Sequence, residues 1–155
     1  MDYAIRQLTN ADLDACKGLL RMFGEVFEDV ETYQSAVPDE AYLRALLAKP
    51  TVVALVAELG GVVVGGLVAY VLDKLERARS ELYIYDLAMA EAHRRKGIAR
   101  ELIHALEPIA RAKGAWVIYV QADPIDDPAV ALYTGLGKRE DVYHFDIPVT
   151  VQPER

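Results

Sequence analysis

The amino-acid sequence predicts a mixed α/β fold, in which helices flank a mostly antiparallel sheet that contains one central pair of parallel strands. Residues 51–72 form two runs rich in β-branched side chains joined by two glycines, which is typical of an antiparallel hairpin. Residues 81–89 and 115–122 are apolar runs separated by a helical pattern, so we expect two parallel strands with a right-handed crossover. The length of 155 residues suits a single domain over residues 1–155.

The first third of the chain supplies one further strand and two helices. Residues 3–8 alternate in polarity like a strand, and apolar residues recur at helical spacing from about residue 10 to residue 27. Residues 28–37 show neither period, and we expect a loop there. Pro38, followed by two acidic residues, is typical of the first turn of a short helix, which we expect to end near residue 48.

The last third supplies the remaining elements. The residues after Gly97 present an apolar helical face, and Pro108 within it should kink the helix or shorten its last turn. Residues 126–137 are expected to form a short helix, and residues 142–149 a final strand. The expected order along the chain is therefore β-α-α-β-β-β-α-β-α-β.

Composition excludes several classes of protein. The chain has 17 Lys and Arg against 24 Asp and Glu, a net charge of −7, which disfavours a nucleic-acid surface and suits a cationic substrate. Cys16, the single cysteine, excludes an intrachain disulfide, and the scattered His93, His104 and His144 do not resemble a metal site, so we expect no metal. Without a signal peptide or a membrane-spanning run, we expect a cytoplasmic protein that binds no membrane.

One basic stretch stands out against this acidic background. The sequence AEAHRRKGIAREL, residues 90–102, places four basic side chains around Gly97 at the expected start of a helix. Backbone N–H groups and the helix dipole make such a start suitable for a phosphate or pyrophosphate, and glycine lets an anion approach the backbone. The alternative is a solvated basic helix start, and the stretch alone favours neither reading.

Its context matches a known superfamily. The pattern R-x-x-G-x-A at Arg94, Gly97 and Ala99 resembles the acetyl-coenzyme A signature of the Gcn5-related N-acetyltransferases. It follows a strand, as in that superfamily, and PAVALYTGLGK resembles a later motif in which Asp126 replaces the usual Asn. The resemblance implies that superfamily's fold, with a central parallel strand pair that splays apart between helices.

Longer sequence segments are similar to one family within this superfamily. RSELYIYDLAMAEAHRRKGIA, VIYVQAD, DDPAVALYTGLGKRE, HFDI and FGEVFEDVETY resemble the aminoglycoside 3-N-acetyltransferases of the gentamicin-resistance type. This resemblance implies acetyl transfer from acetyl-coenzyme A (acetyl-CoA) to the 3-amino group of an aminoglycoside such as gentamicin. We also expect a homodimer. The alternatives are an acetyltransferase for a polyamine, another small amine or protein lysine, and an acetyl-CoA-binding sensor without turnover.

The resemblance also implies which residues bind acetyl-CoA as co-substrate. Backbone groups at the end of the strand would bind the pantetheine arm, and the basic turn would bind the pyrophosphate. The expected set is Leu87, Ala88, Met89, Arg94, Arg95, Lys96, Gly97, Ile98, Ala99, Arg100, Asp126, Ala129 and Tyr133.

Two residues are candidates for catalysis. Tyr133 matches the superfamily's tyrosine that faces the coenzyme sulfur, where a phenol could protonate a departing thiolate; the alternative is simple packing. Asp86 lies within an apolar strand, where a carboxylate is costly to bury, so it is either a structural group or the base that accepts the acceptor's proton. Side chains of a regular strand alternate between its two faces, which would place Asp86 on the face opposite Tyr83 and Tyr85. A β-bulge could turn Asp86 toward the cleft expected to bind the acceptor.

Acidic and aromatic residues are the candidates for binding a polycation. Each acidic one by itself is equally compatible with a solvated surface charge, so their clustering is the informative property. The expected substrate-binding set is Glu28, Asp29, Tyr83, Tyr85, Asp86, Asp123, Asp127 and Asp146.

Overall fold

The computed structural model describes residues 2–150, with the side chains of all but residues 34 and 35. The contacts within the chain divide it into two compact units, Met1–Gln121 and Ala122–Arg155. Each unit is described by itself below.

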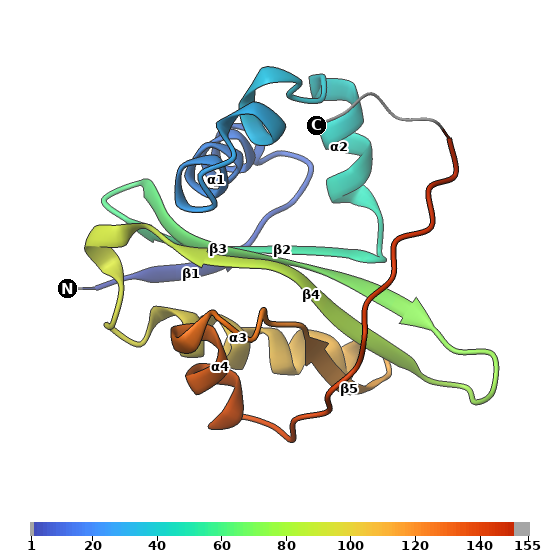
Figure 1. Cartoon of the computed structure of the whole chain (residues 1–155). Coiled ribbons are helices and arrows are strands. Elements are labelled where there is room, and N and C mark those ends of the chain that lie inside the picture. Colours follow the sequence, from blue (N-terminus) through green and yellow to red (C-terminus); the bar gives the residue numbers. More distant parts are fainter. Residues whose placement is uncertain (1, 151–155) are drawn as a thin grey trace. The chain divides into compact units, whose positions relative to one another are not determined.

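The first unit is a five-stranded sheet with helices on both faces (Figure 1). Its strands lie in chain order: β1 (Ala4–Gln7), β2 (Val52–Leu59), β3 (Val62–Asp73), β4 (Ser80–Met89) and β5 (Ala115–Val120). The first four pair antiparallel, whereas β4 and β5 are parallel. The predicted α/β fold class, with its single parallel pair, is confirmed.

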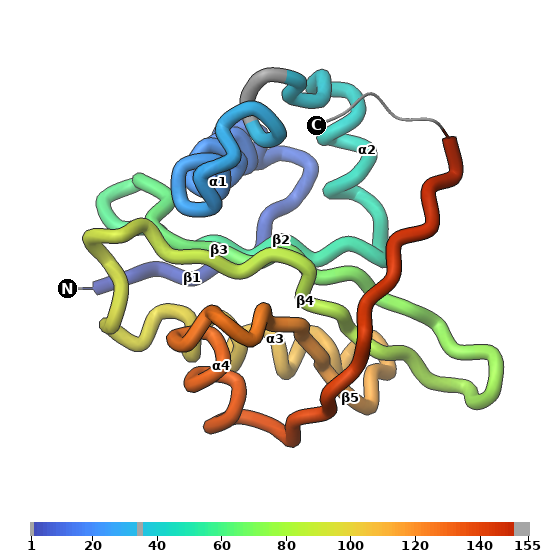
Figure 2. The backbone as a smooth tube through the Cα atoms, in the orientation of Figure 1, coloured from blue at the N-terminus to red at the C-terminus, as the bar shows by residue number. Residues whose placement is uncertain are grey.

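The turn of the β2–β3 hairpin consists of the two expected glycines. Gly60 and Gly61 have φ angles of 58° and 80°, a region that side chains with a Cβ atom rarely occupy. The two strands then pair from Leu59 and Val62 back to Val52 and Tyr70. Figure 2 shows how the following β3–β4 connection extends past the rest of the sheet.

Helices α1 (Leu13–Val26) and α2 (Glu40–Ala48) cover one face of the sheet, and α3 (Ile98–Ala112) covers the other (Figure 1). Phe23 of α1 is 1% exposed and packs in a core with Leu43 of α2 and Val56 of β2. Cys16 is also buried on this helix face, and burial raises the pKa of its thiol. The opposite core is formed by the apolar face of α3, which buries Ile98, Leu102, Ile103, Leu106 and Ala110.

Two local expectations for the first unit were wrong, and one of the two effects expected of Pro108, an early end of its helix, is absent. The first helix begins at Leu13 rather than near residue 10, because the Asp12 carboxylate accepts hydrogen bonds from the Thr9 backbone and hydroxyl and leaves the preceding residues outside the helix. Within the expected loop, Glu31–Ser35 form a π-helical turn, η1. Helix α3 continues past Pro108 to Ala112, so the proline does not end it early.

The second unit contains α4 (Asp127–Thr134), the expected short helix, with Pro128 in its first turn. The final strand expected at residues 142–149 is wrong: the described residues after Lys138 form no strand. An extended segment becomes a strand only when its backbone pairs with another strand, and within residues 2–150 this segment has no such partner.

Candidate active site

The basic turn joins β4 to α3 through backbone that favours an exposed N-terminus. Arg95 and Gly97 have φ angles of 61° and 79°, and α3 begins at the next residue, Ile98. Gly97 is the N-cap, and no side chain caps the helix. Among the described residues, the first backbone N–H groups of α3 therefore have no helical or side-chain acceptor, which is the arrangement that binds anions.

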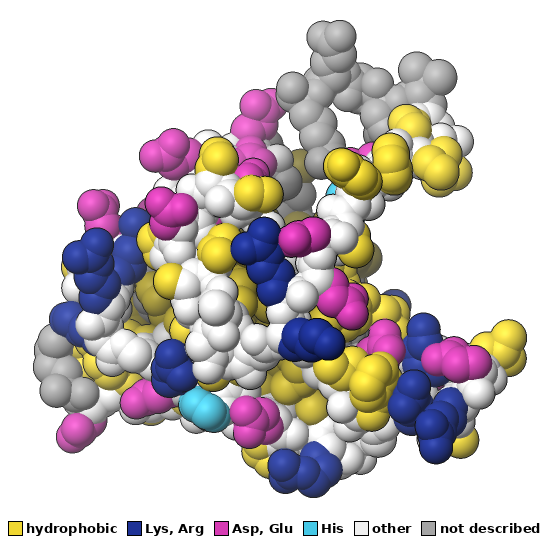
Figure 3. Space-filling view, turned by 60° about the horizontal axis from the view of Figure 1, so that its bottom comes forward, with side chains coloured by type: hydrophobic (Ala, Val, Ile, Leu, Met, Phe, Trp, Pro, Cys, Tyr) yellow, Lys and Arg dark blue, Asp and Glu magenta, His cyan; other side chains and the backbone are white. Residues whose placement is uncertain are grey.

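The space around this turn also suits a large anion. A Cβ atom built on Gly97 would meet no atom within 4 Å, so the backbone is open to a ligand. Arg94, Arg95, Lys96 and Arg100 are exposed around it, whereas Ile98 is buried and anchors the helix in the core. Figure 3 shows Lys and Arg side chains interspersed with Asp and Glu side chains on the face that it presents. The turn thus fits the pyrophosphate expected from the sequence.

Strand β4 continues past the end of its parallel partner. Pairing between β4 and β5 ends at Ile84 and Val120, while β4 extends to Met89. Leu87, Ala88 and Met89 pair only with β3, on their other side. Their backbone on the β5 side is therefore free of a strand partner in the described part of the sheet, which suits an extended arm such as pantetheine.

A β-bulge in β4 turns Asp86 onto the face covered by α1. Val68 pairs with Asp86, but the next residue, Ala69, pairs with Ile84, so Tyr85 is the inserted residue. Val68 packs against the core beneath α1. Residues directly opposite each other share a face of the sheet, so Asp86 lies on the α1 face as well. The bulge considered from the sequence is present.

Asp86 is half-buried and hydrogen-bonded to a residue that the sequence did not single out. The hydroxyl of Tyr33, in η1, donates to Oδ1 of Asp86 at 3.2 Å. Burial raises the pKa of the Asp86 carboxyl above its ordinary value, and the hydrogen bond from Tyr33 partly offsets that rise. A carboxylate with a raised pKa is a better proton acceptor near neutral pH than an ordinary surface aspartate.

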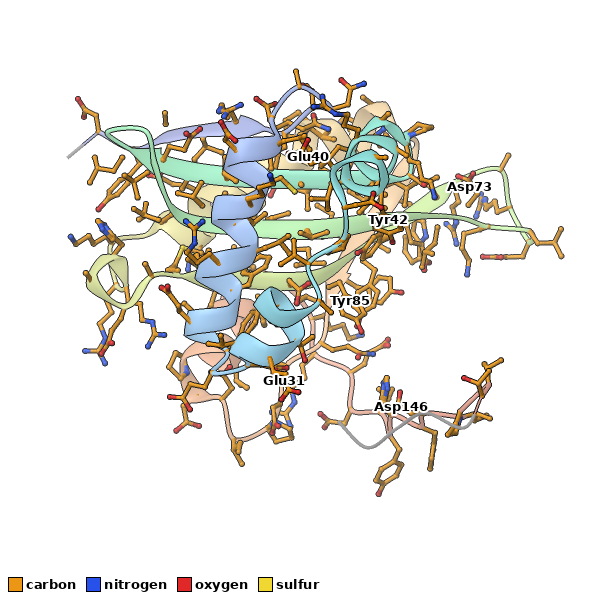
Figure 4. The ribbon with its side chains drawn as sticks, turned by 90° about the horizontal axis from the view of Figure 1, so that it is seen from above. Glu31, Glu40, Tyr42, Asp73, Tyr85 and Asp146 are labelled. Atoms are coloured by element: carbon orange, nitrogen blue, oxygen red, sulfur yellow. The ribbon has the colours of Figure 1, made fainter. Side chains whose placement is uncertain are left out.

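Tyrosine rings extend from Asp86 across three strands. Tyr83 of β4 stacks on Tyr119 of β5 with ring centroids 4.7 Å apart, and Tyr85 meets Tyr70 of β3 edge to face at 6.0 Å. Tyr85 also contacts Tyr83, although it is 63% exposed. Figure 4 shows Tyr85 at the sheet beside the turn that carries Glu31. We call the side chains of Tyr70, Tyr83, Tyr85, Tyr119 and Asp86 the acceptor face.

The sequence analysis named only part of this face. Tyr33, Tyr70 and Tyr119 were missed, since their positions became neighbours only through the strand register and the path of η1. Only the strand pairing could have identified Tyr70 and Tyr119, because Tyr70 lies opposite Tyr83 and Tyr83 lies opposite Tyr119.

Two of the expected acidic residues, Glu28 and Asp29, lie in the segment that enters η1. Glu28 is exposed and has a φ of 54°, which is unusual for a residue with a side chain. Asp29 accepts a hydrogen bond from the Thr32 backbone at 3.2 Å. The charges of both Asp29 and Asp86 raise the pKa of Tyr33, so these two carboxylates act on the same phenol.

The second unit contains the remaining residues of the expected coenzyme set. Tyr133 lies in α4, where burial, followed by the charge of Asp126, raises the pKa of its phenol to about 12. Asp126 is the N-cap of α4, and its side chain accepts from the Ala129 backbone at 3.3 Å. Asp126 can therefore cap a helix as well as the Asn that the superfamily pattern prefers.

The acidic residues of this unit are exposed. Asp123 accepts a hydrogen bond from the Ile125 backbone, and Asp127 lies in the first turn of α4. Asp146 lies 2.8 Å from the His144 ring. The structure brings Asp29, Asp86 and the tyrosines together within the first unit, and it describes Asp123, Asp127 and Asp146 separately in the second.

A family model connects both units. The model of the Acetyltransferase (GNAT) family matches residues 17–137, which include the basic turn, the bulged strand and α4. The chain belongs to this family. Among solved structures, an aminoglycoside acetyltransferase from an uncultured soil metagenomic sample, HMB0005, is 51% identical, with a TM-score of 0.95 over 97% of this chain and 100% of that one.

Two further proteins are less similar in sequence to this chain. The aminoglycoside acetyltransferase meta-AAC0020, also from a soil metagenomic sample and solved with sisomicin, is 33% identical, with a TM-score of 0.87 over 96% of this chain and 97% of that one. N-acetyltransferase family 8 member 2 of Rattus norvegicus is 30% identical over 90 residues, 58% of this chain. The chain spans 40% of the length of that curated relative.

Across residues 2–150, no three His, Cys, Asp or Glu side chains are grouped so that they could hold a metal ion. Among the helices of the same residues, none is long and apolar enough to cross a membrane.

Proposed function

We propose that this GNAT family member transfers the acetyl group of acetyl-CoA to the 3-amino group of an aminoglycoside such as gentamicin, and thereby confers resistance. The observation that supports this proposal is the acceptor face, which places a half-buried carboxylate among tyrosine rings. Such a surface suits an amino sugar, because rings pack against its apolar faces and a carboxylate attracts its ammonium group. The similarity to two aminoglycoside acetyltransferases supports this choice of acceptor.

In the proposed complex, backbone carries most of the coenzyme binding. The N–H groups at the start of α3 would hold the pyrophosphate, with Arg94, Arg95, Lys96 and Arg100 adding charge. The free backbone of Leu87, Ala88 and Met89 would hydrogen-bond the pantetheine arm. When bound, acetyl-CoA supplies an activated acetyl thioester. We propose that Asp126, Ala129 and Tyr133 of the second unit also bind the coenzyme, and that residues 1–155 act as one functional domain, which the family match across residues 17–137 supports.

Asp86 prepares the acceptor amine in this proposal. An aminoglycoside amine is largely protonated at neutral pH, and the Asp86 carboxylate binds the ammonium by charge. Asp86 then accepts one proton, directly or through a water molecule, so that the amine nitrogen gains a free lone pair. We propose that Glu28, Asp29, Asp123, Asp127 and Asp146 attract the other ammonium groups.

Tyr133 assists departure of the thiolate in this proposal. With a pKa of about 12, its phenol stays protonated at neutral pH. A thiol has an ordinary pKa of about 8.5, so complete transfer of the phenol proton to the sulfur is unfavourable. We therefore assign Tyr133 a hydrogen bond to the sulfur as negative charge develops there, with the proton supplied in the end by solvent.

A direct comparison of acceptors tests the proposed function. Release of the coenzyme thiol is measured with gentamicin, spermidine and a lysine peptide, and the acetylated position in gentamicin is read by NMR. The proposal expects kcat/KM for gentamicin to exceed the others at least a hundredfold, with the acetyl group on the 3-amino nitrogen. Equal rates with spermidine or the peptide would contradict it.

We also propose a homodimer, in which a second copy covers an exposed apolar segment. The large side chains after residue 141 are unusually exposed: Val142 is 71% exposed, Tyr143 90%, Phe145 80%, Ile147 86% and Val149 97%. Monomers commonly expose single apolar side chains, whereas several large ones close together in the chain are typical of a surface that a partner covers. Light scattering on Phe145→Glu tests this: the wild type should be dimeric and the variant monomeric, whereas a monomeric wild type would contradict the proposal.

A further inference from the structure

Tyr33 is held firmly where it meets Asp86. Its ring packs against Phe23 and Phe27 of the α1 end, with ring centroids 6.1 Å and 5.7 Å away. Phe23 and Phe27 stack on each other at 5.4 Å, and Phe23 is 1% exposed. The Tyr33 backbone N–H donates to the Asp29 carbonyl at 3.2 Å. The phenol is therefore directed toward β4 by the core and by the π-helical turn together.

The direction of the hydrogen bond is also fixed. Burial, followed by the charge of Asp86, raises the pKa of Tyr33 to about 12, so the phenol keeps its proton across the range in which enzymes work. A protonated phenol can only donate to an ionised carboxylate. The bond stabilises the charged form of Asp86 and opposes the effect of burial on its pKa.

We propose that Tyr33 is a positioning residue, which holds the Asp86 carboxylate in its ionised form and in the orientation that receives the acceptor's ammonium group. This inference rests on the proposed role of Asp86 as the base. It adds η1 to the site: a segment more than fifty residues earlier in the chain sets the position and the proton affinity of the reacting carboxylate.

The other groups near Asp86 do not replace this function. Burial, with a smaller contribution from the Asp86 charge, raises the pKa values of Tyr70 of β3 and Tyr83 of β4, so both stay neutral at working pH. Asp29, before η1, is acidic like Asp86 and supplies no positive charge to it. The hydrogen bonds described for the Asp86 side chain within residues 2–150 come from Tyr33 alone.

The test is Tyr33→Phe, which keeps the ring and removes the hydroxyl. Because the lost bond favoured the carboxylate, the pKa of Asp86 should rise by about one unit. Carboxyl ¹³C NMR titration of the protein without substrates measures this directly. The acid limb of the pH dependence of kcat should move to higher pH by the same amount. At pH 7, kcat for gentamicin should fall about tenfold because the carboxylate loses its fixed orientation, with KM changed less than threefold.

Tyr3→Phe is a matched control. It removes a phenol hydrogen bond of the same 3.2 Å length, made to Nδ1 of His93 instead of a carboxylate. The pKa of Asp86 and the acid limb should be unchanged in this variant. An unchanged Asp86 pKa in Tyr33→Phe, or an equal shift in both variants, overturns the proposal.

Failure of the proposed function has a different signature. If Asp86→Asn acetylates gentamicin at the wild-type rate, Asp86 is not the base, and the positioning role proposed for Tyr33 in this reaction is then also wrong. If Asp86→Asn is inactive but Tyr33→Phe leaves both the Asp86 pKa and kcat unchanged, Asp86 is the base and only the positioning role of Tyr33 is wrong.

Discussion

The basic turn before α3 and the acceptor face differ in the kind of group that does the binding. At the turn, backbone N–H groups and the open space at Gly97 make the site, with side chains adding only charge. On the acceptor face, the groups are side chains from η1, β3, β4 and β5, and a single inserted residue, Tyr85, sets their arrangement. We infer that side-chain changes can alter the acceptor without affecting the coenzyme, whereas the turn tolerates few changes.

The largest expected effect is at the turn. Gly97→Glu places a side chain and a negative charge where the pyrophosphate would lie and forces that side chain into a left-handed backbone conformation. Calorimetry should show a loss of acetyl-CoA affinity of a hundredfold or more. Gly114→Glu is the matched control, because Gly114 has a φ of 74° and equally open surroundings after the other end of α3. Similar coenzyme affinities in the two variants would refute the turn as the anion site.

The next effect concerns the leaving group, which belongs to neither region. Tyr133→Phe removes the hydroxyl that we propose bonds to the coenzyme sulfur and should slow turnover by about 10²-fold. The coenzyme affinity should stay within about twofold of wild type, because the ring remains. Steady-state kinetics at pH 7 measure the effect. A wild-type kcat in Tyr133→Phe would mean that Tyr133 only packs against its neighbours.

A smaller effect should separate the acceptor from the coenzyme. Tyr85→Ala removes an exposed ring from the acceptor face, and the lost contacts should raise KM for gentamicin about five- to tenfold. Affinity for acetyl-CoA should not change. Val62→Ala, at a β3 residue that is 62% exposed, is the control for loss of an equally exposed side chain. A weaker coenzyme complex in Tyr85→Ala would show that the two regions are not independent.

The smallest effect is on stability. Burial raises the pKa of Asp86, so the folded state holds this proton more tightly than the unfolded state does. Ionised Asp86 therefore costs stability once the pH exceeds the ordinary aspartate pKa, and the cost grows until the pH exceeds the folded pKa. Asp86→Asn should melt like wild type near pH 3 and a few degrees higher at pH 7.

Asp73→Asn is the control for that comparison, because Asp73 is exposed at the end of β3 (Figure 4). Its melting temperature should follow wild type at every pH. A lower melting temperature of Asp86→Asn at pH 7 would mean that the Asp86 charge stabilises the fold.

The sequence could predict one of the two regions and not the other. The turn is a run of neighbouring residues, and the strand–helix–strand unit around it follows from local apolar patterns and crossover handedness. The pairing of Tyr33 with Asp86 joins residues far apart in the chain, and residues 28–37 carry no periodic pattern that predicts η1. The expected strand at residues 142–149 had the right alternation, but a strand also needs a partner, which no local pattern supplies.

The central claim is that Asp86 serves the acceptor and not the coenzyme or the fold. It is tested most directly by measuring, on one sample of Asp86→Asn, the acetyl-CoA affinity, the melting temperature at pH 7 and the rate of gentamicin acetylation per folded molecule. We predict wild-type coenzyme affinity, a melting temperature no lower than wild type, and a rate reduced by about 10²-fold or more. A wild-type rate per folded molecule in a variant with a lowered melting temperature would contradict the claim and make Asp86 a structural residue.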